Sequence, residues 1–84
     1  MEINKLASQG LKFMVEFRST VTVPVMCRQL QIDSREAVAV MMYILRRRKS
    51  WFSVVSDGND GPAYIVSPKH IADVVKFLDR GGFR

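Results

Sequence analysis

The sequence predicts one small α+β domain, in which four helices are accompanied by a β-hairpin between the third helix and the fourth. Apolar residues recur at helical spacing in several segments, and two β-prone runs flank a cluster of turn-forming residues. The chain has 84 residues, of which 48% are hydrophobic and 25% charged, so it can bury one modest core. A single domain over residues 1–84 is therefore expected.

The first helix is expected over residues 2–17, where apolar residues fall on one face. Gly10 lies in the middle of this segment and weakens the helix by about 1 kcal/mol relative to alanine. Residues 19–23, STVTV, are rich in β-branched side chains and suit a short strand alongside a hairpin. The helix is therefore expected to lead into a strand.

Two helices joined by a tight turn are expected next. Pro24 favours the first turn of a helix that continues to about Gln31. Asp33 and Glu36 form a capping-box pattern, in which each side chain satisfies a free backbone N–H group. This pattern predicts a third helix over residues 34–49, which contain no helix breaker.

A hairpin is expected after the third helix. Residues 51–56 and 63–67 are β-prone and are separated by turn-forming residues. Trp51 and Phe52 should point to opposite faces of the first strand, because side chains alternate along a strand. The acidic turn at residues 57–60 disfavours insertion of the hairpin tip into a DNA minor groove.

The last helix is expected to begin at Ser67 and Pro68, because serine is a preferred N-cap and proline suits the first helical position. Gly81 and Gly82 should end it. The order is then helix, short strand, helix, tight turn, helix, hairpin and helix. This order is typical of a winged helix-turn-helix domain, in which the hairpin is the wing.

Most of the excess positive charge lies around the third helix. The formal net charge of the chain is +5, and residues 28–49 contribute +4 of it, because six cations face only Asp33 and Glu36. Such a local field attracts polyanions. The six cations are Arg28, Arg35, Arg46, Arg47, Arg48 and Lys49.

The second helix of such a motif enters the major groove of double-stranded DNA, with its N-terminal residues toward the base edges. We expect base contacts from Ser34, Arg35, Ala39 and Met42, with arginine suited to guanine and the apolar side chains to thymine methyl groups. Phosphate contacts are expected from Arg28, Tyr43, Arg46, Arg47, Arg48 and Lys49. The sequence therefore predicts a DNA-binding transcription regulator.

Binding to a protein is the alternative, because the centre of the third helix is apolar on most sides. In that case a partner or co-regulator would cover the outer apolar residues, which are Val38, Ala39, Met42 and Tyr43. A homodimer is also compatible with the sequence, since dimers are usual for palindromic DNA sites. The sequence leaves the oligomeric state open.

Enzymatic activity, a metal site and a cofactor are not expected. Cys27 is the only cysteine, so an intrachain disulfide and a cysteine-ligated metal site are excluded. His70 is the only histidine, and the spacing places no catalytic carboxylate beside it. A signal peptide and a long apolar span are missing, so a cytoplasmic protein without a membrane segment is expected.

Residues 37–59, AVAVMMYILRRRKSWFSVVSDGN, resemble the CaiF/GrlA family of enterobacterial transcription activators. An alanine, a Tyr-Ile pair, basic residues and a strand leading to a polar turn recur there in the same order. Residues 21–33, VTVPVMCRQLQID, are more loosely similar to the first motif helix and turn of that family. The resemblance implies a sequence-specific DNA-binding activator, whose third helix from Ser34 carries the contacts, and it implies no small-molecule cofactor. A bacterial, phage or plasmid origin is expected for such a regulator.

Overall fold

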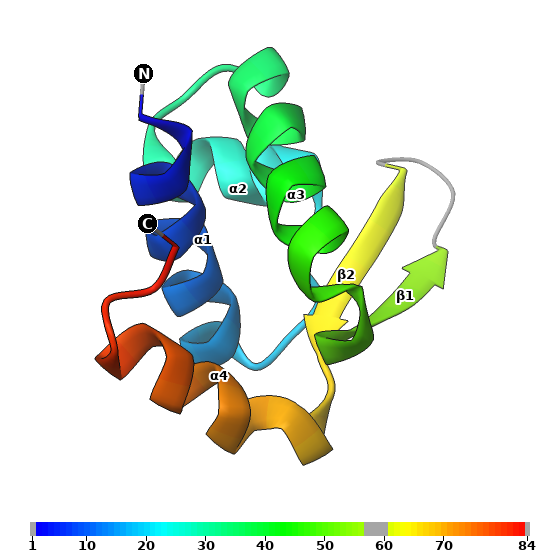
Figure 1. Ribbon diagram of the computed structural model, residues 1–84. Coiled ribbons are helices and arrows are strands. Elements are labelled where there is room, and N and C mark those ends of the chain that lie inside the picture. Colours follow the sequence, from blue (N-terminus) through cyan, green and yellow to red (C-terminus); the bar gives the residue numbers. More distant parts are fainter. Residues whose placement is uncertain (1, 57–60, 84) are drawn as a thin grey trace.

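The computed structural model describes residues 2–56 and 61–83 (Figure 1). The chain forms the predicted four helices, with the hairpin between the third and the fourth. The elements are α1 (Ile3–Phe17), α2 (Val23–Leu30), α3 (Ser34–Arg48), β1 (Phe52–Ser56), β2 (Pro62–Val66) and α4 (Ile71–Asp79). Short 3-10 turns at Lys49–Trp51 and Pro68–His70 precede β1 and α4.

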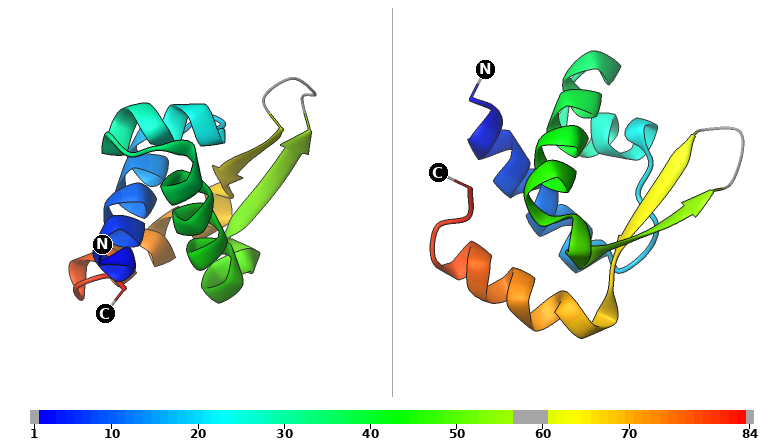
Figure 2. Two further views of the ribbon diagram at one scale, coloured as in Figure 1. Left: turned by 90° about the horizontal axis from the view of Figure 1, so that it is seen from above. Right: turned by 45° about the vertical axis from the view of Figure 1, so that its right-hand side comes forward.

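Helix α1 is the element against which the other parts of the domain pack. It contacts α2, α3, α4 and β2, and the helices surround it on several sides (Figure 2). Gly10 is buried where α1 meets α2 and α3. A Cβ atom at Gly10 would lie 3.2 Å from Met26 Sδ and 3.4 Å from Val40 Cγ1. Glycine thus permits a closer approach of three helices than a larger residue would.

The turn between α2 and α3 is fixed by the predicted capping box. Asp33 Oδ1 accepts a hydrogen bond from the backbone N–H of Glu36 at 2.8 Å, and Glu36 Oε1 accepts one from Asp33 N–H at 3.5 Å. Gln31 ends α2 in the left-handed conformation, with φ of 56°. Local sequence signals therefore decide where α3 begins.

The strand predicted over residues 19–23 is reduced to a single antiparallel bridge beside the hairpin. Only Val21 pairs with the hairpin, donating to Tyr64 O at 2.7 Å and accepting from Tyr64 N–H at 2.9 Å. The next residue, Thr22, is already the N-cap of α2, and its hydroxyl accepts from Val25 N–H at 3.5 Å. Pro24 has no N–H group to donate, so helix capping replaces further strand pairing.

The hairpin strands pair antiparallel over their full length, starting with Phe52 opposite Val66. Trp51 is not part of β1, so the prediction that Trp51 and Phe52 occupy opposite faces of one strand is wrong. Trp51 is instead the last residue of the 3-10 turn that follows α3. Its ring lies edge-on to the ring of Phe77 in α4, at a centroid distance of 5.4 Å. The contact between Trp51 and Phe77 therefore lies where the chain turns from α3 into β1.

The start of the last helix also differs from its prediction. Ser67 does not cap α4 with its side chain, and its hydroxyl lies 3.0 Å from the Ser53 hydroxyl of the neighbouring strand. Pro68 opens a 3-10 turn, and α4 begins only at Ile71. The Ser67 hydroxyl thus bonds to Ser53 and does not cap the helix.

The segment after α4 folds back onto α1. Gly81 and Gly82 end the helix as predicted, with φ of 108° and 69°. Phe83 N–H then donates to Ser8 Oγ at 2.8 Å, and the Phe83 side chain is buried. A Cβ atom on Gly82 would lie 2.6 Å from Ser8 Oγ, so only glycine fits this contact. The end of the described chain is thereby tied to the N-terminal helix.

Gly10→Val should lower the free energy of unfolding by about 1–3 kcal/mol, because the added side chain must displace Met26 and Val40 in a packed core. Urea denaturation measures this loss. The matched control is Gln9→Val, which introduces the same side chain at an exposed position of the same helix. Equal losses for the two variants would contradict the packing role of Gly10.

Asp33→Ala should cost about 1 kcal/mol of stability, because it removes the side-chain acceptor at the start of α3. Thermal and urea unfolding both report the change. Glu16→Ala, at an exposed position of α1, serves as the control and should change stability by less than about 0.5 kcal/mol. A stable Asp33→Ala variant would show that packing alone holds the N-terminus of α3.

Candidate nucleic-acid interface

Helix α3 and the turn after it present a row of side chains that points away from the core. This outer row consists of Arg35, Ala39, Met42, Arg46 and Lys49, at helical spacings of three and four residues. Its three cationic residues are exposed, as is Met42, and Ala39 is half-buried. The opposite side of α3 is buried and carries Ala37, Val40, Met41 and Ile44.

Three of the four residues predicted to contact bases lie on this outer row, and the fourth lies at the start of the same helix. Arg35, Ala39 and Met42 belong to the outer row, and Ser34 is the first residue of α3 and is exposed. The cations of the outer row have no carboxylate within salt-bridge distance in the described part of the chain. The outer row is therefore a positively charged surface with an apolar centre.

An apolar groove borders the outer row between α3 and the hairpin. It has a volume of about 560 Å³ and is lined by Leu45, Lys49, Ser50, Phe52, Val54 and Tyr64. Phe52 and Val54 alternate along β1, and Tyr64 pairs with Val54 across the hairpin. The sequence does not predict this groove, because the groove depends on the angle between α3 and the hairpin.

The four consecutive cations at the end of α3 do not form one cluster. Arg46 and Lys49 lie on the outer row, whereas the guanidinium carbon of Arg47 lies 3.8 Å from the ring centroid of Tyr43. That of Arg48 lies 5.1 Å from the centroid of Trp51 and 5.1 Å from that of Phe77. Successive helical residues point about 100° apart, so neighbouring cations face different sides.

Tyr43 accompanies Arg47 on the flank of α3. Its ring meets the buried ring of Phe83 edge-on, at a centroid distance of 5.3 Å. Arg28, another predicted phosphate contact, is exposed in the last turn of α2. A cation at that position also complements the negative end of the helix dipole. The predicted phosphate contacts therefore do not form one cluster, because Arg47 and Arg48 lie against aromatic rings.

The sequence-based statement that no carboxylate lies beside His70 is wrong. Its Nδ1 atom lies 3.1 Å from Asp73 Oδ2, three residues later at the start of α4. Both side chains are accessible to solvent, with exposed fractions of 25% for His70 and 56% for Asp73. Over residues 2–56 and 61–83, His, Cys, Asp and Glu form no group suited to a metal ion. The helices of the same residues are too short or too polar to cross a membrane.

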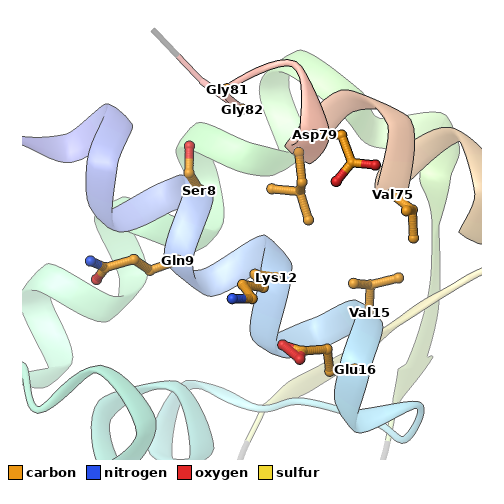
Figure 3. A pocket seen from close by; sticks show the side chains of 10 residues that line it. Ser8, Gln9, Lys12, Val15, Glu16, Val75, Asp79, Gly81 and Gly82 are labelled. Carbon is orange, nitrogen blue, oxygen red and sulfur yellow. The ribbon is translucent and has the colours of Figure 1, made fainter.

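A second hollow, of about 420 Å³, lies between α1 and α4 (Figure 3). Lys12 and Glu16 face Val75 and Asp79 across it. Its rim carries charges of both signs, so it has no preference for a polyanion. The acidic hairpin tip that the sequence predicts, residues 57–60, lies outside the described residues.

Comparison with known proteins relates the chain to solved structures alone: no protein-family model matches it, and no curated protein sequence does. One match is MepR, a transcription regulator of the Staphylococcus aureus multidrug efflux pump MepA, with a TM-score of 0.68 and 12% identity. It covers 89% of this chain and 55% of the MepR chain. A mutant of S. aureus MepR matches with a TM-score of 0.65 and 14% identity, over 87% of this chain and 54% of its own.

The chain thus spans about half the length of the MepR chains that it matches. At this level of identity, the likeness establishes the fold. The helices, the two-stranded antiparallel hairpin and the C-terminal helix are those of a winged-helix domain, as the sequence predicts.

Proposed function

We propose that this chain is a DNA-binding transcription regulator that places the outer row of α3 in the major groove of double-stranded DNA. The observation that carries the proposal is the outer row itself, which is exposed, cationic at both ends and free of carboxylate partners in the described part of the chain. The fold supports this placement of α3, because the second helix of a helix-turn-helix is the one that enters the major groove.

The N-terminal half of α3 would face the bases. Arg35, in the first turn, can donate two hydrogen bonds to O6 and N7 of guanine. Ala39 and Met42 present apolar atoms that suit thymine methyl groups. Ser34 is exposed beside Arg35 and adds a hydroxyl. Since α3 has no asparagine or glutamine, the usual partners of adenine, direct reading rests on few contacts.

The phosphate contacts would come from Arg46 and Lys49 at the far end of the row and from Arg28 on α2. The stacked side chains of Tyr43, Arg47 and Arg48 are left out of this duplex surface, because their aromatic contacts direct them elsewhere. Such a protein binds DNA mainly through phosphates and contacts few bases directly. Its specificity would then come from a second copy or a protein co-regulator.

A protein-binding role for the same face is the second candidate, and the exposed apolar side chains favour it. The exposed fractions are 47% for Val38, 43% for Met42 and 62% for Val54. Val54 lines the groove beside the outer row, and Met42 belongs to the outer row itself. A protein partner would bury them, whereas a duplex would leave most of the groove open.

The first prediction concerns salt. The affinity for a random-sequence duplex, measured by fluorescence anisotropy, should fall with added salt with a log–log slope of about −3 for three phosphate contacts. The double variant Arg46→Glu/Lys49→Glu should bind at least about tenfold more weakly and reduce the size of the slope by about 2.

The matched control for that experiment is Lys5→Glu/Lys12→Glu, which makes the same change in net charge on exposed positions of α1. It should lose much less affinity. An equal loss of duplex affinity in the two double variants would mean that binding depends on the net charge of the chain and not on the outer row. A wild-type chain that fails to bind a duplex even at low salt would leave protein binding as the function of this face.

The second prediction concerns base reading. Arg35→Ala should relax the preference at one guanine of the selected site by about 1–3 kcal/mol, as measured by selection from a random pool followed by titration. Arg46→Ala is the comparison, because loss of a phosphate contact weakens binding to all sequences alike. A uniform loss with Arg35→Ala would place Arg35 at the phosphates.

A further inference from the structure

We propose that the side of the domain between α3 and α4 is a second anion-binding surface, which binds an acidic segment of a partner protein. This stacked-arginine surface consists of Arg47, Arg48 and Lys76 with the rings of Tyr43, Trp51 and Phe77. The inference goes beyond the proposed function, because it needs no duplex and uses none of the outer row.

The two arginines are held by rings and not by carboxylates. Arg47 lies over Tyr43 at 3.8 Å from the ring centroid, and Arg48 lies 5.1 Å from the centroids of both Trp51 and Phe77. Both arginines are exposed, and neither has a carboxylate within salt-bridge distance among residues 2–56 and 61–83. Stacking occupies the face of a guanidinium and leaves its edge N–H groups available for a bidentate carboxylate.

Two hollows flank Arg48 and give the surface its shape. One has a volume of about 220 Å³ and lies between Arg47, Arg48 and the rings of Tyr43, Phe77 and Phe83. The other has about 470 Å³ and is lined by Arg48, Trp51, Lys76, Phe77, Arg80 and Asp73. Its acidic residue, Asp73, lies 3.1 Å from His70. A cationic rim over aromatic walls suits a segment in which acidic and aromatic side chains alternate.

The position of the surface favours a protein segment over the duplex that the outer row would bind. Arg48 follows Arg46 by two residues, which is a rotation of about 200° around the helix. Helix α4 passes below the C-terminal end of α3 on that side, and its Phe77 contacts Arg48 (Figure 1). A duplex held against the outer row therefore lies away from these arginines. Hollows of this size admit individual side chains, whereas the backbone of a duplex is convex.

The test uses a fluorescein-labelled peptide of alternating aspartate and phenylalanine, titrated with the full chain at physiological salt. Arg47→Ala/Arg48→Ala should weaken peptide binding at least about tenfold, because two charge-assisted contacts are lost. The matched control, Arg46→Ala/Lys49→Ala, removes the same charge from the outer row and should weaken it by less than about threefold. For a random duplex the order of the two variants should reverse.

The conservative variant Arg47→Lys/Arg48→Lys separates shape from charge. It keeps both charges and loses the planar fork, so peptide binding should also fall about tenfold. Unchanged peptide binding by this variant would overturn the proposal, as would equal losses with the two alanine variants. If Arg47→Ala/Arg48→Ala weakens duplex binding as much as the outer-row variant does, these arginines belong to the DNA interface instead.

A spectroscopic measurement on the wild-type chain keeps the test valid if a variant fails to fold. Addition of the peptide should shift the indole N–H resonance of Trp51 and leave the backbone N–H resonances of Arg35 and Ala39 unchanged. A peptide in which asparagine replaces aspartate should produce no shift. An unshifted Trp51 resonance at saturating acidic peptide would contradict binding at this surface.

Discussion

The close approach of three helices at Gly10 is the constraint on which the rest of the structure depends. Without a Cβ atom, the backbone of α1 can lie against Met26 of α2 and Val40 of α3 at once. Helix α1 also contacts α4 and β2, so the packing at Gly10 joins α3 to the element that holds the rest of the domain. The position of α3, which carries the outer row, thus depends on a glycine in the core.

Sequence signals that act between near neighbours predicted much of this fold. Asp33 and Glu36 satisfy each other's backbone N–H groups within four residues, so the start of α3 could be read directly. Signals that compete with tertiary contacts gave wrong predictions: the Ser67 hydroxyl bonds to that of Ser53 in β1 and does not cap α4. The stacking of Arg48 could not be predicted from the sequence, because it depends on where α4 places Phe77.

The same short run of cations is suited to two different tasks. Arg46 is exposed and has no salt bridge to any of residues 2–56 and 61–83, which suits long-range attraction to phosphates and sensitivity to salt. Arg48 stacks on two rings, so less side-chain entropy is lost when it forms a hydrogen bond. Helical rotation therefore places adjacent arginines in different environments. An arginine in solvent attracts phosphates at long range, whereas an arginine held against rings can bind one carboxylate in a defined geometry.

The hairpin has a consequence for the behaviour of the protein in concentrated solution. In the described part of the chain, β1 has β2 on one side and no strand on the other. Its sequence, FSVVS, has no charge and no proline, and Val54 and Val55 are exposed. Such an edge is a template for pairing with another strand. Mutual repulsion from the net charge of +5 opposes this pairing, so high salt and polyanions, which screen that charge, favour self-association through β1.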